Sequence, residues 1–71
     1  MITEVQITEG GQATLYAQHC PSGLNLQQFL IRLVEDIVLA PSNMRKVRVA
    51  GTVLEIDRRD VTSVTVTQDS N

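Results

Sequence analysis

The sequence has few of the residues that cross-link a protein or anchor it in a membrane. Its 71 residues include one cysteine, one phenylalanine, one tyrosine and no tryptophan. A single cysteine excludes an intramolecular disulfide, and no apolar run approaches the roughly 18 residues that a transmembrane helix needs. Residues 1–11 contain two glutamates and no basic residue, unlike the start of a secretory signal. We therefore expect a cytoplasmic protein that does not associate with membranes.

Basic residues are absent from the first 31 positions, and the formal net charge of the chain is −2. This balance disfavours the strongly basic surface of a dedicated nucleic-acid-binding domain. Five of the six basic residues are nevertheless gathered between positions 45 and 59, interleaved with Glu55, Asp57 and Asp60. They are Arg45, Lys46, Arg48, Arg58 and Arg59. This basic cluster is the candidate site of an alternative, nucleic-acid-binding function, although no aromatic residue lies within it to stack on bases.

Length and composition indicate a single small domain over residues 1–71, with a frayed tail at 68–71. Apolar residues make up 42% of the chain and charged residues 20%, which is typical of a globular domain with an aliphatic core. A core of this size rarely supplies more than about 3 to 5 kcal/mol of stability. We therefore expect self-association or binding to a partner protein to add to it.

The strongest local pattern predicts an amphipathic helix over residues 26–40. Asn25 is a candidate N-cap, and Gln28 can complete a capping box with it. Leu24 and Phe29 occupy the positions of a hydrophobic staple, and Pro41 ends the helix. The apolar stripe consists of Leu26, Phe29, Leu30, Leu33, Val34 and Ile37.

Two further apolar residues of this helix, Ile31 and Val38, lie beside the stripe. They are seven positions apart and therefore share a face. This helix shoulder, as we call the pair, is expected to pack either on the sheet or on another subunit.

Alternation of apolar and polar residues predicts strands at 2–7, 13–17, 47–49, 52–56 and 61–67. Gly10 and Gly11 supply the positive φ angles of a hairpin turn. Ala50-Gly51 permits a reversal or a bulge, which leaves open whether the third and fourth segments form a hairpin or one bent strand. The order ββαβββ predicts an α+β fold with an antiparallel sheet and the helix packed on one face. The predicted core consists of Val5, Ile7, Leu15, Leu26, Phe29, Leu30, Leu33, Val34, Ile37, Val47, Val49, Leu54, Ile56, Val64 and Val66.

The residue types that carry chemistry do not form a recognisable catalytic or metal-binding set. His19 precedes Cys20, but adjacent residues of an extended chain point to opposite sides, and the sequence has no second His or Cys. The carboxylates lack the spacing of zinc or calcium sites. Glu35 and Asp36 diverge by about 100° on a helix and can each pair with Arg32. We therefore expect no enzymatic activity, cofactor, metal or small-molecule substrate.

The leading hypothesis is a non-enzymatic protein-binding module: a regulator, inhibitor or accessory subunit that acts as a homo-oligomer or on a larger protein. Its candidate contact residues are Ile31 and Val38 on the helix shoulder and Thr65 and Thr67 on the last strand. If that strand lies at an edge of the sheet, its unpaired backbone groups can accept a strand from another chain. The alternative is a nucleic-acid-binding module that uses the basic cluster, with binding that weakens steeply with salt.

Overall fold

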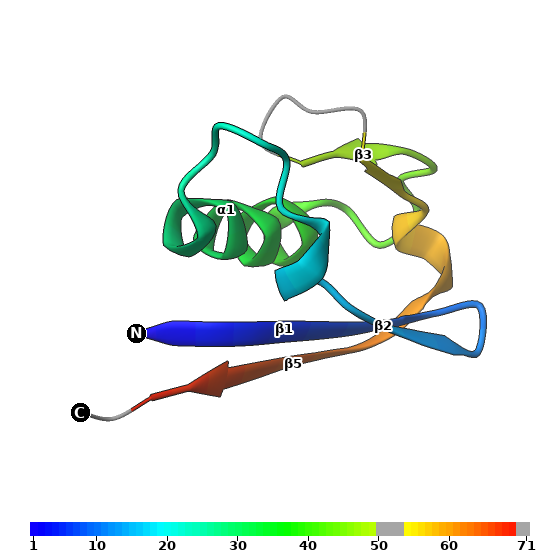
Figure 1. Ribbon diagram of the computed structural model, residues 1–71. Helices are drawn as coiled ribbons and strands as arrows, with labels where there is room; N and C mark the ends of the chain where they lie inside the picture. Colours follow the sequence, from blue (N-terminus) through cyan, green and yellow to red (C-terminus); the bar gives the residue numbers. More distant parts are fainter. Residues whose placement is uncertain (50–53, 70–71) are drawn as a thin grey trace.

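A computed structural model describes residues 1–49 and 54–69. One helix, α1 (Leu26–Leu39), lies between a three-stranded sheet and a two-stranded sheet (Figure 1). The larger sheet has the order β2-β1-β5, and the smaller one pairs β3 with β4. The strands are β1 (Ile2–Glu9), β2 (Gln12–Leu15), β3 (Val47–Arg48), β4 (Glu55–Ile56) and β5 (Val61–Gln68). The predicted α+β fold and the order ββαβββ are confirmed, with the strands divided between two sheets.

Helix α1 begins where its flanking residues predict and ends one residue earlier than predicted. The Asn25 side-chain oxygen accepts a hydrogen bond from the Gln28 backbone N–H at 3.1 Å, which confirms the N-cap. Ala40 has extended backbone angles, φ −69° and ψ 142°, as the residue before Pro41 favours. The helix therefore ends at Leu39, one residue before the expected position.

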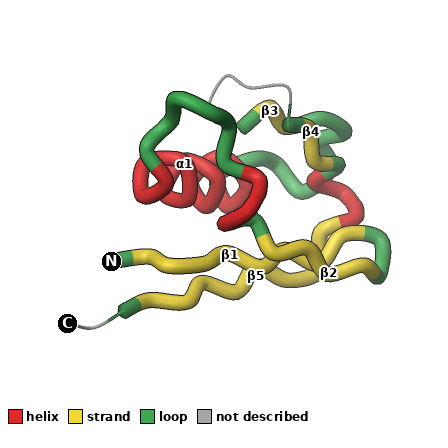
Figure 2. Tube along the Cα trace, in the orientation of Figure 1, coloured by secondary structure: helices red, strands yellow, loops and turns green. Residues whose placement is uncertain are grey.

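Strand β1 is the central strand of the larger sheet and carries two fully buried residues, Val5 and Ile7. Both belong to the core that includes the buried residues of α1. The helix covers this side of the sheet, and no element of the described residues covers the opposite face (Figures 1 and 2). The turn between β1 and β2 holds Gly10 at φ 59° and Gly11 at φ 82°, in agreement with the predicted hairpin. The buried face of α1 consists of Phe29, Leu30, Leu33 and Ile37.

The prediction that Leu15 belongs to the core is wrong. The β1–β2 register pairs Ile7 with Thr14 and Gln6 with Leu15, so Leu15 lies on the open face and is 54% exposed. β2 ends at Leu15, and a short 3-10 helix, η1 (Ala17–His19), follows it. Tyr16, between these two elements, is buried in place of Leu15.

Leu26 and Val66 are also more exposed than predicted, at 42% and 36%. Leu26 is the first residue of α1, so no preceding helical turn covers it. Val66 pairs with Val5 and faces the α1 side, but it lies on an outer strand while the helix packs on the central one. Three other predicted core residues, Val34, Leu54 and Val64, are half-buried against the core.

The smaller sheet shows whether the third and fourth predicted strands form a hairpin or one bent strand. Val47 pairs with Ile56 and Arg48 with Glu55 in antiparallel register, so β3 and β4 are the two arms of a hairpin and not one bent strand. Val47, Val49 and Ile56 are buried and join the core. The predicted reversal at 50–51 and the predicted strand start at 52 lie outside the described residues, as do residues 70–71 of the expected tail. Residue 68 of that tail belongs to β5.

The single tyrosine reports directly on the packing of the β2–η1 connection. Burial of its ring raises the pKa of Tyr16 above the ordinary value of about 10, and the negative charge of Glu9 acts in the same direction. The Thr14 side chain has a smaller, opposing effect on this pKa. The folded state therefore holds the phenolic proton more tightly than the unfolded chain does.

We expect the free energy of unfolding to be insensitive to this group below the unfolded-state pKa and to fall as pH rises through the folded-state pKa. Phenolate absorbance during an alkaline titration, followed at native and at denaturing urea concentrations, measures both midpoints. The Glu9→Gln variant should lower the native midpoint. Coincident native and denatured midpoints would show that the ring is not buried.

Candidate functional site

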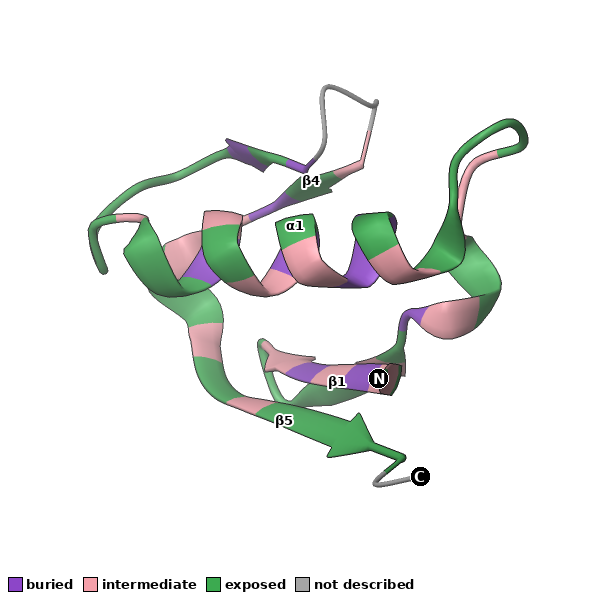
Figure 3. Cartoon of the chain, turned by 90° about the vertical axis from the view of Figure 1, so that its left-hand side faces the viewer, coloured by how far each residue is buried: buried purple, intermediate pink, exposed green. Residues whose placement is uncertain are grey.

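Strand β5 forms one edge of the larger sheet. It pairs with β1 from Val61 to Gln68, with a register shift near each end, and among residues 1–49 and 54–69 no strand pairs with its other side (Figure 2). Its sequence, VTSVTVTQ, contains no charged residue, no proline and no glycine, and six of its eight residues are exposed (Figure 3). Long edge strands in native proteins usually carry a charge, a proline or a covering segment that prevents pairing with other chains. The sequence of β5 contains neither a charge nor a proline that would hinder such pairing.

The opposite side of the sheet is protected in two ways. β2 is only four residues long, and it covers β1 from Gln6 to Glu9. Beyond β2, the Tyr16 N–H donates to the Val5 carbonyl at 2.9 Å, and the Ala17 N–H donates to the Glu4 carboxylate at 2.9 Å. The start of η1 therefore occupies the edge of β1 that β2 leaves free, and β5 is the strand of this sheet that the described residues leave open to pairing.

Thr65 and Thr67, two of the predicted contact residues, lie on β5 and are exposed. Thr65 pairs with Gln6, which in turn pairs with Leu15, so all three side chains share the open face of the sheet. Thr67 pairs with Glu4. On the other face of β5, Val64 and Val66 point to the α1 side, where Val64 is half-buried.

The helix shoulder is only partly free. Ile31 is half-buried, whereas Val38 is 57% exposed. Leu39, which the sequence pattern did not single out as a contact residue, is 80% exposed at the end of α1. The shoulder therefore offers one fully exposed valine and part of an isoleucine, which is a smaller surface than β5.

The three basic residues around β3 are exposed, and two of them share one acidic partner. Lys46 Nζ lies 3.8 Å and Arg48 Nε 3.7 Å from the carboxylate of Glu55, on the paired strand β4. Arg45 is also exposed, and its charge contributes to lowering the pKa of Asp57. Exposed pairs of this kind leave the side chains accessible to solvent and contribute little to stability.

The two remaining basic residues lie in the 3-10 helix η2 (Arg58–Asp60) and are engaged within the molecule. Arg59 contacts both carboxylate oxygens of Asp57, with Nε–Oδ1 at 3.0 Å and Nη2–Oδ2 at 2.7 Å. These hydrogen bonds are the main reason that the pKa of Asp57 is lowered and that of Arg59 raised. Together with Arg58, whose contact is described next, four of the five residues of the basic cluster contact other residues of this chain.

Arg58 satisfies a backbone group that the helix itself cannot satisfy. Its Nε donates to the carbonyl oxygen of Ile37 at 2.9 Å. In a continuing helix that carbonyl would accept from the residue four positions later, which is Pro41 and has no N–H. Arg58 therefore ties η2 to the last turn of α1, and sequence spacing alone gives no sign of this role.

His19 and Cys20 do not face each other as a catalytic pair. The His19 Nδ1 lies 3.0 Å from the Leu15 carbonyl oxygen, and its ring contacts that of Tyr16 with centroids 5.2 Å apart. The half-buried Cys20 thiol donates toward the carbonyl oxygens of Leu24 and Pro21. In the described part of the chain, no group of three or more potential ligand side chains is placed to hold a metal ion.

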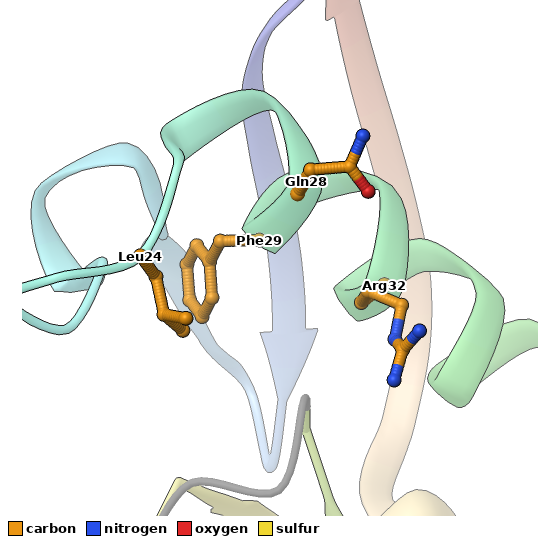
Figure 4. A pocket seen from close by; sticks show the side chains of 4 residues that line it. All are labelled: Leu24, Gln28, Phe29 and Arg32. Atoms are coloured by element: carbon orange, nitrogen blue, oxygen red, sulfur yellow. The ribbon is translucent and has the colours of Figure 1, made fainter.

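A small depression lies beside the first turns of α1, lined by Leu24, Gln28, Phe29 and Arg32 (Figure 4). Its volume is about 160 Å³. Pockets for small-molecule ligands usually measure about 300 to 1,000 Å³. Leu24 and Phe29 come together here as the predicted staple, so the depression is a by-product of the entry into the helix and is too small for an ordinary substrate.

Comparisons with known proteins add no functional assignment: no protein-family model, no curated protein and no solved structure matches the chain. Within the described residues, no helix combines the length and the apolar character of a transmembrane span.

The contact between Arg58 and Ile37 can be tested by mutation. We expect Arg58→Ala to lower the free energy of unfolding by about 1.5 kcal/mol, near the lower limit for a hydrogen bond to a charged donor, because Arg58 is half-buried. Urea unfolding followed by circular dichroism measures the change. Arg59→Ala, which breaks an exposed ion pair, is the matched control and should have a much smaller effect.

A double-mutant cycle isolates the cause. Pro41→Ala restores a backbone N–H at the position that would pair with the Ile37 carbonyl, so Arg58→Ala should cost less in that background. An equal cost in both backgrounds would mean that the helix terminus is not what Arg58 stabilises.

Proposed function

We propose that this protein is a non-enzymatic binding module that takes a β-strand of another polypeptide onto the free edge of β5. The observation that carries the proposal is the uncharged, eight-residue edge strand whose outer side has no partner strand among the described residues. Alternate residues of such a strand present N–H and C=O groups outward, and an added strand can satisfy these groups. A bound protein is therefore recognised through its backbone first and through its side chains second.

The contrast between the two edges of the sheet supports this assignment. The β1–β2 side is covered by a short strand, by η1 and by the carboxylate of Glu4. Covering one edge and leaving the longer edge uncovered is the arrangement expected of a protein that uses the second edge for binding. The helix shoulder, with Ile31 half-buried, is the weaker candidate surface.

Nucleic-acid binding by the basic cluster ranks below protein binding. Arg58 is committed to the end of α1, Arg59 is held by Asp57, and Lys46 and Arg48 lie beside Glu55. Contact with phosphates would compete with these interactions, and the net charge of the chain is negative. A salt titration of binding to fluorescent single-stranded and duplex oligonucleotides tests the alternative.

Lysine substitutions on β5 test the proposed strand addition. Thr65→Lys combined with Thr67→Lys places two charges on the exposed edge, where lysine is a common natural protection against strand pairing. Used as bait in a cell extract, the wild type should retain specific proteins that the double-lysine variant loses. Quantitative mass spectrometry of the captured proteins provides the measurement.

Two single-lysine variants serve as controls for this experiment. Ala13→Lys adds charge to the same open face on the opposite edge strand, and Val38→Lys adds it to the helix shoulder. Both should retain the wild-type set of proteins. If the double-lysine variant captures the same proteins as the wild type, or if Val38→Lys alone abolishes capture, strand addition at β5 is not the mode of binding.

A further inference from the structure

Strand β5 has a sequence that complements itself in antiparallel orientation. Between Ser63 and Thr67, where its pairing with β1 is regular, its residues alternate between the two faces of the sheet, with Val64 and Val66 on the α1 side and Thr65 on the open side. A second copy of the strand, turned by a twofold axis perpendicular to the sheet, presents the same alternation in reverse. Directly opposite residues of antiparallel strands lie on the same face, so residues of each face meet residues of the same face in the second copy.

One register also matches the side chains by type. If the twofold axis passes beside Thr65, this residue lies opposite its own copy. Val64 then lies opposite Val66 of the partner subunit, and Ser63 lies opposite Thr67 of the partner subunit. Paired β-branched residues and paired hydroxyl residues are favourable cross-strand neighbours. A shift of the axis by one residue, to Val64, keeps one valine–valine contact, between Val64 and its own copy, but places Thr62 opposite Val66 of the partner subunit.

We propose that the free edge of β5 pairs with β5 of a second copy in this Thr65-centred register, which joins two three-stranded sheets into one six-stranded antiparallel sheet. This inference rests on the proposed binding function of the edge and names its partner. No charge lies between Val61 and Gln68, so the pairing brings no like charges opposite each other. A foreign strand would match the faces in the same way, but the match of side-chain types would depend on its own sequence.

The pairing also covers apolar surface that one copy leaves open. Val66 is 36% exposed and Val64 is half-buried, because α1 packs on β1 and only partly shields the outer strand. In the paired sheet the two valines of each copy lie side by side with those of the other copy, on the helix side. The extra apolar contact offsets part of the cost of associating two small domains.

The oligomeric state tests whether a second copy binds. Light scattering across a concentration series should show a wild-type dimer that dissociates on dilution. The Thr65→Lys, Thr67→Lys variant, which places like charges across the interface, should be a folded monomer, with a dissociation constant raised roughly tenfold or more. Val38→Lys should remain a dimer. Circular dichroism establishes that each variant is folded.

Cysteine cross-linking tests the register, in a background in which the native Cys20 is replaced by serine. Opposite residues of antiparallel strands have Cα atoms about 4.5 to 5.5 Å apart, within the range of a disulfide. Thr65→Cys should therefore form a covalent dimer under mild oxidation. Thr62→Cys is the control, because six residues along the strand separate it from its copy by roughly 20 Å.

Three outcomes would overturn the inference, and they bear differently on the proposed function. A wild type that is monomeric throughout, but loses its captured proteins when Thr65 and Thr67 become lysine, excludes self-pairing and leaves strand addition standing. A dimer in which Thr62→Cys cross-links as readily as Thr65→Cys excludes this register. A dimer dissociated by Val38→Lys and not by the two lysines on β5 excludes the self-pairing, and the capture experiment then decides the edge function.

Discussion

Helix α1 and strand β1 bury each other's apolar side chains, and every other element is attached to this pair. Val5 and Ile7 on the strand and four residues of the helix are at most 1% exposed. The β3–β4 hairpin adds its buried residues to the other side of the helix, and β2 and β5 flank the strand. In a chain of 71 residues with one phenylalanine and no tryptophan, this aliphatic layer is the principal source of stability.

Charged side chains then satisfy backbone groups that the regular elements leave unpaired. Glu4 accepts from the Ala17 N–H beside β1, and Glu9 accepts from the Asp57 N–H at the start of η2. Arg58 donates to the carbonyl that Pro41 leaves without a partner. All three side chains form hydrogen bonds with backbone groups close to the core. Charges engaged in this way are not available for contact with other molecules.

The distribution of these protections explains why β5 is the functional candidate. Polar contacts at the β2 side of the sheet close that edge, whereas the β5 side has eight uncharged residues and mostly exposed side chains. The same strand leaves Val66 uncovered because the helix is centred on β1. Backbone pairing capacity and exposed apolar surface therefore coincide on one strand, which is a more specific basis for a binding surface than apolar exposure at the helix shoulder.

The sequence by itself determined the elements whose causes are local. The cap at Asn25, the helix end before Pro41 and the turn at Gly10 and Gly11 each depend on residues within a few positions, and all three are present. The apolar stripe of the helix likewise identified its buried face. Such features are set by backbone geometry and short-range hydrogen bonds, which the sequence specifies directly.

The tertiary structure alone decided which face each strand buries and which strand lies at the edge. Leu15 and Tyr16 are neighbours in the sequence, and only the register with β1 exposes the first and buries the second. The edge position of β5 depends on its pairing with β1, more than fifty residues earlier in the chain. The partner of Arg58 is fixed by how η2 meets the end of α1. These features arise from contacts between distant segments, and an alternating pattern fits either face of a strand until its neighbours are in place.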